Sequence, residues 1–253
     1  MPTKTVSPLE MPPLEGRRIS FCTLPAEDMP AALAIDVADR LSAAIQSRGR
    51  AVLHVSGGQS PIPVFRALSD QPLQWHKVQV SLADERCVPL GHPDSNATLV
   101  RTHLMQGRAA SARFLPLVNE ATEPLPEPTV LAQQADQALR SQGPADVLIL
   151  GMGADGHTAS IFAEMSDLAQ ALDLQSQRVC LPVMQAELPE NVRHDRITQT
   201  LAHLLSARHI VLQIGGSDKL QTLQRACADR RGRWPIASVL HQSQAPVAVW
   251  ISS

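Results

Sequence analysis

The chain has 253 residues, of which 44% are hydrophobic and 18% are charged, and this composition excludes a largely disordered protein. Lysine and arginine number 22 against 24 acidic residues, and a net charge of -2 provides no basic field for nucleic acid or an anionic membrane. The four cysteines lack metal-ligand spacing, and no apolar run resembles a membrane span or a signal peptide, so we expect a cytoplasmic protein.

The predicted elements begin after a proline-rich segment, residues 1–17, which we expect to be a flexible tail. Beyond it, apolar runs typical of strands occur at residues 18–23, 51–55, 78–82, 147–150, 197–200, 209–214 and 247–250. Helices are predicted to follow the first four of these strands, beginning near residues 30, 61, 95 and 158.

Uninterrupted apolar strands separated by helices are typical of a parallel sheet that is buried on both faces. The run Val147-Leu148-Ile149-Leu150 is a clear example. We therefore predict one α/β domain over residues 18–253, with a mostly parallel sheet covered by helices on both faces. Ligands of such sheets bind beyond the carboxyl ends of the strands, where four polar segments should meet: residues 56–60, 83–96, 151–157 and 215–219.

The first of these segments is a candidate phosphate-binding loop. Gly57 and Gly58 allow a ligand to approach the backbone closely, and Gln59 follows them. Ser60 is predicted to be the N-cap of the next helix and Pro61 its first residue, so that free backbone amides face the ligand. The same pattern also fits an ordinary strand-to-helix turn.

Residues 151–156 match the dinucleotide-binding fingerprint letter for letter, but the motif lies past mid-chain and lacks the usual following strand with an acidic residue. Asp155 and His157 instead bring a carboxylate and an imidazole to the expected cleft. Histidine can take a proton from water near neutral pH and return it, as lactone or ester hydrolysis requires. Because no Gly-x-Ser-x-Gly motif occurs, direct attack by water is simpler than an acyl-enzyme.

Charged residues in the other two segments are candidate ligands for an anion. Asp84 and Arg86 belong to an Asp-Glu-Arg triplet, where the arginine would neutralise a ligand charge or an oxyanion. Arg196 begins a predicted strand and Lys219 follows a Gly-Gly turn, so both would complete a phosphate site if they reach the glycine loop. A solvated turn and two surface cations are the plain alternatives.

Taken together, these motifs resemble those of the 6-phosphogluconolactonase family. The family pattern has a glycine-rich phosphate loop, Asp-Glu-Arg-x-Val-Pro, Gly-x-Gly-x-Asp-Gly-His-Thr-Ala-Ser, and Arg-(Val/Ile)-Thr followed by Gly-x-x-x-Lys, and this chain carries each in order. The resemblance spans residues 19–250 and is most specific over residues 151–160. Gln59 and Ser60 stand where Ser-Thr is more usual, which affects the expected phosphate geometry and leaves the chemistry intact.

The resemblance implies a three-layer, Rossmann-like α/β domain and a carboxylic ester hydrolase that converts 6-phospho-D-glucono-1,5-lactone to 6-phospho-D-gluconate, the second step of the oxidative pentose phosphate pathway. It implies His157 as the general base, Asp155 as the neighbour that orients it, and Arg86 as an electrostatic partner. The expected contacts to substrate or phosphate are Gly57, Gly58, Gln59, Ser60, Asp84, Arg196 and Lys219. We expect no metal, cofactor, nucleic acid or membrane partner, and a monomer or weak homodimer.

Two other functions stay open. Glucosamine-6-phosphate deaminases share the fold and an Asp-Gly-His triplet, but their histidine is followed by Ile-Ala-Phe-Asn-Glu-Pro, whereas residues 158–162 here are Thr-Ala-Ser-Ile-Phe and the next acid is Glu164. A catalytically silent sugar-phosphate sensor would tolerate loss of the base, yet His157, Asp155 and Arg86 are all present. A sensor also usually needs an output module, for which the chain leaves little room.

Overall fold

The computed structural model describes residues 18–119, 124–229 and 233–253. Within these ranges, seven parallel strands form one sheet in the order β1 (Ile19–Leu24), β10 (Val247–Ser252), β9 (Ile210–Gly215), β6 (Val147–Leu150), β2 (Ala51–Val55), β3 (Val78–Leu82) and β5 (Arg113–Phe114). From β2 the chain continues through β3 and β5 to one edge of the sheet, and from β6 it continues through β9 and β10 toward the other edge. The strand order therefore reverses between β2 and β6. Ligands of open parallel sheets bind at such a reversal.

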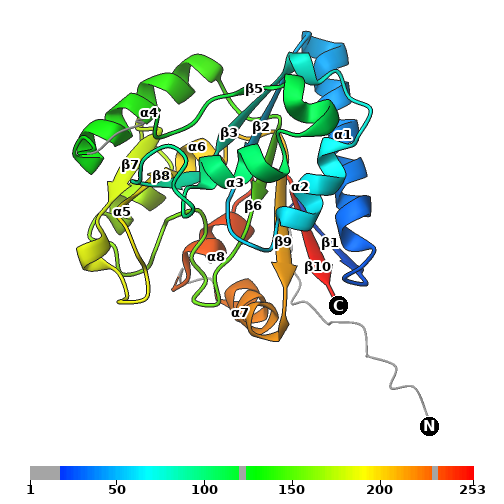
Figure 1. Cartoon of the computed structure of the whole chain (residues 1–253). Coiled ribbons are helices and arrows are strands. Elements are labelled where there is room, and N and C mark those ends of the chain that lie inside the picture. The colour runs from blue at the N-terminus through cyan, green and yellow to red at the C-terminus, as the bar shows by residue number, and fades with distance from the viewer. Residues whose placement is uncertain (1–17, 120–123, 230–232) are drawn as a thin grey trace.

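The described α-helices lie on both sides of this sheet (Figure 1). They are α1 (Met29–Arg48), α2 (Ile62–Ser69), α3 (Asn96–His103), α4 (Pro128–Gln142), α5 (Leu168–Leu172), α6 (Leu201–Leu204), α7 (Ser217–Ala228) and α8 (Pro235–Leu240). Short 3-10 turns occur at Trp75–Lys77, Gly107–Ser111 and Gln185–Glu187. The predicted α/β fold, with a mostly parallel sheet between helices, is confirmed.

Apolar side chains cover both faces because neighbouring residues of a strand point to opposite sides. In β6, Val147 and Ile149 pack into the cluster that holds the apolar faces of α1 to α4. Leu148 and Leu150 pack into the other cluster, with residues of α6, α7 and α8. All four β6 side chains are therefore buried, which explains why the strand reads as an unbroken apolar run.

A second, antiparallel sheet holds β4 (Asp84–Arg86), β8 (Arg196–Gln199) and β7 (Cys180–Val183) in that order. It lies beside the large sheet, where α4 packs against β7 and β8 (Figure 1). No strand was predicted at the Asp-Glu-Arg triplet, which was expected in a polar segment beyond the strand at 78–82, so β4 is a correction. The predicted strand at 197–200 exists, but it joins this small sheet because it pairs with β4 and β7.

Two local predictions were wrong. No helix begins near Thr158, because residues 158–161 form a tight turn in which the Ile161 amide donates to the Thr158 carbonyl at 3.0 Å and Ala159 has a φ of 49°. A positive φ is incompatible with an α-helix. Ser60 is also not the N-cap of α2: the cap is Pro61, whose carbonyl accepts the Phe65 amide at 2.9 Å.

The predicted tail, residues 1–17, lies outside the described residues. Among the helices of the described ranges, none combines the length and apolar character that crossing a bilayer requires.

Candidate functional site

A pocket of about 780 Å³, including its open mouth, lies beyond the carboxyl ends of β2, β6 and β9. It occupies the position where the strand order of the large sheet reverses, and the small sheet forms one of its walls. The pocket is lined by nine of the ten predicted site residues, namely Gly57, Gly58, Gln59, Ser60, Asp84, Arg86, His157, Arg196 and Lys219. The tenth, Asp155, contacts His157.

His157 and Asp155 form a close pair at the mouth of the pocket. The Nδ1 atom of His157 lies 2.6 Å from Oδ1 of Asp155, and the same oxygen accepts the His157 backbone amide at 3.2 Å. Burial raises the pKa of Asp155, but the hydrogen bond and the charge of His157 outweigh burial and hold this pKa below its ordinary value. An ionised carboxylate can only accept, so in the neutral imidazole Nδ1 carries the proton and Nε2 keeps its lone pair.

The pair depends on the glycine at position 153. A Cβ added to Gly153 would lie 2.2 Å from Oδ1 of Asp155 and 2.3 Å from Nδ1 of His157. The Gly153 amide also donates to the His157 carbonyl at 2.9 Å, closing the turn that carries both side chains. In the motif that matches the dinucleotide fingerprint, the space beside Gly153 is thus occupied by the side chains of Asp155 and His157.

The same loop does not suit a dinucleotide. A pyrophosphate in that motif binds at the N-terminus of the helix that follows the glycines. Here a turn follows at residues 158–161, and the next helix, α5, begins at Leu168. The residues present therefore do not fit a nicotinamide or flavin dinucleotide.

Phe162 holds the His157 ring from one side. The two ring centroids are 4.3 Å apart at an interplanar angle of 28°, and the Phe162 side chain is fully buried. The guanidinium carbon of Arg196 lies 5.5 Å from the centroid of the same Phe162 ring. One buried aromatic ring thus supports both a candidate base and a candidate anion ligand.

Asp84 and Glu85 have separate roles, which the sequence could not distinguish. The buried Asp84 lines the pocket and accepts a hydrogen bond from Ser160 Oγ at 2.7 Å, and the same hydroxyl accepts from Arg196 at 3.3 Å. The Glu85 carboxylate instead binds the start of α3. Its carboxylate accepts the amides of Arg86, Asn96 and Ala97 at 2.7 Å each and the Ser95 hydroxyl at 3.0 Å. Burial raises the pKa of Glu85 to about 7, although these hydrogen bonds act in the opposite direction.

Arg86 and Arg196 bring two positive charges to one wall of the pocket, where they are partners in the β4–β8 pairing. Arg86 donates from Nη1 to the Asp94 carbonyl at 2.5 Å. Burial lowers the pKa of Arg196, while the negative charge of Asp84 raises it. The wall thus combines two guanidinium groups with one buried carboxylate.

The glycine loop is packed against two residues that sequence reasoning did not select. A Cβ on Gly57 would lie 1.8 Å from Oδ1 of Asn96, so only glycine fits there. Gln213 of β9 donates from Nε2 to the Ser60 carbonyl at 3.0 Å and ties this loop to the neighbouring strand. Asn96 stood within a segment that the sequence placed at the cleft, whereas no local pattern distinguished Gln213 from its apolar strand neighbours.

Pocket residues account for half of the buried polar side-chain atoms that lack a hydrogen-bond partner among the described residues. The pocket atoms are Ser56 Oγ, Arg86 Nε, Asn96 Oδ1, Arg196 Nε and Gln213 Oε1, out of ten such atoms in all. Buried polar groups without partners are costly and are rare in native proteins. The set holds two guanidinium donors, one hydroxyl and two amide acceptors, so it favours a polar ligand that both accepts and donates hydrogen bonds. The two arginines favour an anionic group on that ligand.

The fold and the pocket together define a class of protein. It is an α/β protein whose ligand pocket is lined by cationic side chains, lies where the strand order reverses, and has a histidine–aspartate pair at its mouth. The family model described as glucosamine-6-phosphate isomerases/6-phosphogluconolactonase matches residues 25–250. A 6-phosphogluconolactonase from Pseudomonas putida is 48% identical over 217 residues, which are 85% of this chain and 86% of that protein. One from Mesorhizobium japonicum is also 48% identical, over 87% of this chain and 89% of that protein.

A solved structure gives the same result. The crystal structure of a putative 6-phosphogluconolactonase from Neisseria gonorrhoeae is similar with a TM-score of 0.87 and 36% identity, covering 93% of this chain and all of that one. The chain belongs to the glucosamine-6-phosphate isomerase/6-phosphogluconolactonase family.

Proposed function

We propose that this chain hydrolyses 6-phospho-D-glucono-1,5-lactone to 6-phospho-D-gluconate, with His157 as the general base and without a metal ion. The observation that carries the proposal is the 2.6 Å contact between His157 and Asp155 at the mouth of a pocket with two partly unpartnered arginines. A base beside an anion site suits a phosphorylated ester. Relatives named for this activity support the choice of substrate.

The base acts through Nε2 of His157, because Asp155 holds the proton on Nδ1. A water molecule loses a proton to Nε2 while its oxygen forms a bond to C1 of the lactone. The bond between C1 and the ring oxygen then breaks as the tetrahedral intermediate collapses. The leaving ring oxygen accepts the proton from the imidazolium, which restores neutral His157. The products are a carboxylic acid and a hydroxyl group, and no acyl-enzyme forms.

Arg86 stabilises the negative charge that develops on the C1 carbonyl oxygen. Its Nε is buried without a partner among the described residues, and its Nη1 is anchored on the Asp94 carbonyl. An anchored guanidinium needs little rearrangement as charge develops, which favours the transition state over the ground state.

The phosphate is held at the other end of the substrate by the backbone of Gly57 and Gly58 together with Gln59, Ser60, Arg196 and Lys219, all of which line the pocket. Asp84 orients Arg196 through Ser160. Binding of the remote phosphate positions C1 for attack, so its energy contributes to the rate of the chemical step.

A deaminase is disfavoured by the position of the next acid in the sequence. Glu164, the first carboxylate after His157, is exposed and does not line the pocket. It is therefore poorly placed to assist ring opening of an amino sugar. A silent sensor is disfavoured because the base, its aspartate partner and the arginine wall are all assembled.

The direct test follows lactone disappearance with 6-phosphogluconolactone generated in the assay, against an enzyme-free blank because the lactone also opens unaided. We expect acceleration that survives EDTA. Loss of activity on chelation would contradict the metal-free mechanism. Binding of 6-phosphogluconate without any acceleration would favour the sensor, and ammonia release from glucosamine 6-phosphate would favour the deaminase.

A further inference from the structure

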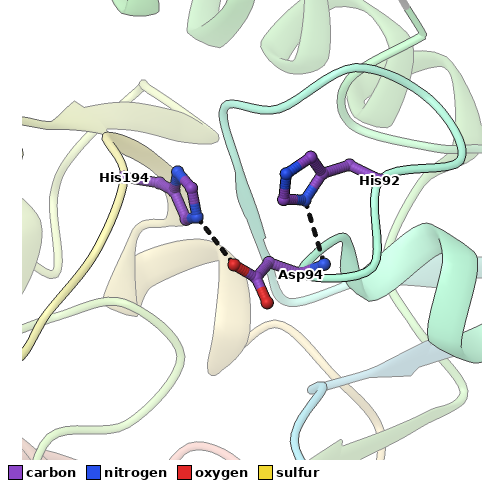
Figure 2. Close-up of side chains that lie close together, drawn as sticks. All are labelled: His92, Asp94 and His194. Carbon is purple, nitrogen blue, oxygen red and sulfur yellow. Dashed lines mark hydrogen bonds and ion pairs between the residues drawn. The ribbon is translucent and has the colours of Figure 1, made fainter.

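Outside the residues that line the pocket, His92, Asp94 and His194 come together from two separate loops (Figure 2). His92 and Asp94 lie between β4 and α3, and His194 lies just before β8. One nitrogen or oxygen atom from each residue lies within 4.8 Å of the other two. Within the described ranges, this is the one cluster of three such side chains close enough to share an ion.

Two hydrogen bonds arrange the cluster. Nε2 of His194 lies 2.8 Å from Oδ2 of Asp94, and the Asp94 amide donates to Nδ1 of His92 at 3.0 Å (Figure 2). The two imidazole rings are nearly perpendicular, with centroids 5.5 Å apart. The side chains of His194 and Asp94 are 29% and 45% exposed, so an ion and its remaining water ligands can reach them.

The backbone at His194 is strained. Its φ is 67°, and in the described part of the chain only Ala159 shares a positive φ among residues other than glycine. Such a conformation is costly and persists only where neighbours enforce it. The adjacent Asp195 does so: its carbonyl accepts the Cys87 amide, and its carboxylate accepts the Gln185 amide, both at 2.8 Å. The fold thus holds His194 against the loop of Asp94.

We propose that His92, Asp94 and His194 bind a zinc ion that joins these two loops beside the pocket. Two imidazoles and one carboxylate are a usual ligand set for zinc, with one or more waters completing the coordination. On binding, the hydrogen bond between Asp94 and His194 is exchanged for two metal–ligand bonds, and neutral His194 binds through Nε2 with its ring proton on Nδ1. A proton is released to solvent only from the fraction of His194 that was charged before the ion bound. The Asp94 amide likewise gives up its hydrogen bond to Nδ1 of His92 where that nitrogen takes the ion.

The ion would stabilise a segment that holds a pocket residue, because the Asp94 carbonyl accepts the hydrogen bond from Arg86. The Arg86 hydrogen bond to Asp94 is already present without an ion, so zinc would act on stability, and no step of the proposed hydrolysis passes through it. The inference does not rest on the proposed function, and its test reads metal binding directly.

The test uses the full chain, stripped of metal with EDTA, desalted, and titrated with zinc chloride by calorimetry at pH 7.5. We expect one zinc per chain with a dissociation constant in the micromolar range or below. With zinc in large excess over that constant, the thermal midpoint should rise by roughly 5 °C. Absence of saturable binding by the wild-type chain would overturn the proposal.

Three variants connect the binding to the cluster. His194→Asn removes one imidazole but keeps a residue that tolerates a left-handed backbone. Asp94→Asn removes the charge but keeps the side-chain shape and the backbone carbonyl that accepts from Arg86. His92→Gln removes the second imidazole. Each should weaken zinc binding at least tenfold and abolish the thermal shift. His76→Asn changes an exposed histidine elsewhere and should bind zinc like the wild type. The melting curve of His194→Asn without zinc shows whether this variant is folded. If it is folded and still binds zinc with the wild-type affinity, the ion does not bind at this cluster.

Discussion

Arg86 and Arg196 lie directly opposite each other in the antiparallel pair of β4 and β8, and the Nε atom of each is buried without a partner among the described residues. Like charges that face each other across two strands are destabilising. Asp84 offsets part of this repulsion on the Arg196 side. The arrangement is therefore better explained by binding of an anion than by stability of the small sheet.

Replacing Arg196 should separate phosphate binding from the chemical step. We expect Arg196→Gln to raise KM for the phosphorylated lactone about 10- to 100-fold, the scale of a lost charge-assisted contact, and to change kcat less. Steady-state kinetics with 6-phosphogluconolactone and with unphosphorylated gluconolactone measure the difference. Arg193→Gln is a matched control, because Arg193 is an exposed neighbour outside the pocket. Equal weakening for both lactones would remove Arg196 from the phosphate site.

His157→Ala should lower kcat by about 10²- to 10⁴-fold with folding intact, the usual scale for loss of a general base. Asp155→Asn should also lower kcat, because the asparagine can present its NH₂ group to Nδ1 and leave the ring proton on Nε2, the wrong tautomer for a base. Both effects are read from kcat alongside circular dichroism, with His76→Ala as an exposed control. A folded His157→Ala variant with unchanged kcat would exclude His157 as the base.

Gly153→Ala should damage catalysis more than stability. Its added methyl group would lie within 2.4 Å of Asp155 and His157 atoms, and these side chains are partly exposed, at 46% and 29%, so they can move to avoid it. We expect kcat to fall at least tenfold, about 1.4 kcal/mol of transition-state stabilisation. Gly151→Ala, whose Cβ meets no atom within 4 Å, serves as the comparison for unfolding free energy in urea. Wild-type kcat in Gly153→Ala would show that the observed pair geometry is not required.

Acid should destabilise the fold through His203, which lies near His54 with ring centroids 6.0 Å apart. Burial, reinforced by the charge of His54, lowers the pKa of His203 from 6.5 to about 4. His203 therefore binds a proton more weakly in the folded protein than in the unfolded chain. Protonation of His203 therefore does not lower the free energy of unfolding above pH 6.5. As the pH falls from 6.5 toward 4, this free energy decreases by about 1.4 kcal/mol per pH unit.

Urea unfolding at pH 7.5 and pH 5.0 measures this effect. The wild-type chain should lose about 2 kcal/mol through His203 between these two values, and His203→Gln should lose correspondingly less. His76→Gln, at an exposed position, should behave like the wild type. An identical pH dependence in His203→Gln and the wild-type chain would show that His203 is not responsible.

Much of the site could be predicted because chain order and strand direction constrain it strongly. In a parallel sheet the carboxyl ends of the strands share one edge, so loops after residues 55, 150 and 215 had to meet there. Glycines, Asp155, His157 and Lys219 in those loops were found on that basis. Gln213 was missed because its amide sits among buried β9 residues, and only the fold brings it to Ser60.

The sequence by itself determined the alternation of strands and helices, the edge at which polar loops gather, and the type of side chain available there, because periodicity and local turn chemistry are properties of short segments. Tertiary structure alone decided which acid of the Asp84–Glu85 pair faces the pocket, that Arg86 stands opposite Arg196, and that His194 meets Asp94. These relationships join segments far apart in the chain, and their geometry depends on strand pairing and packing that no local pattern encodes.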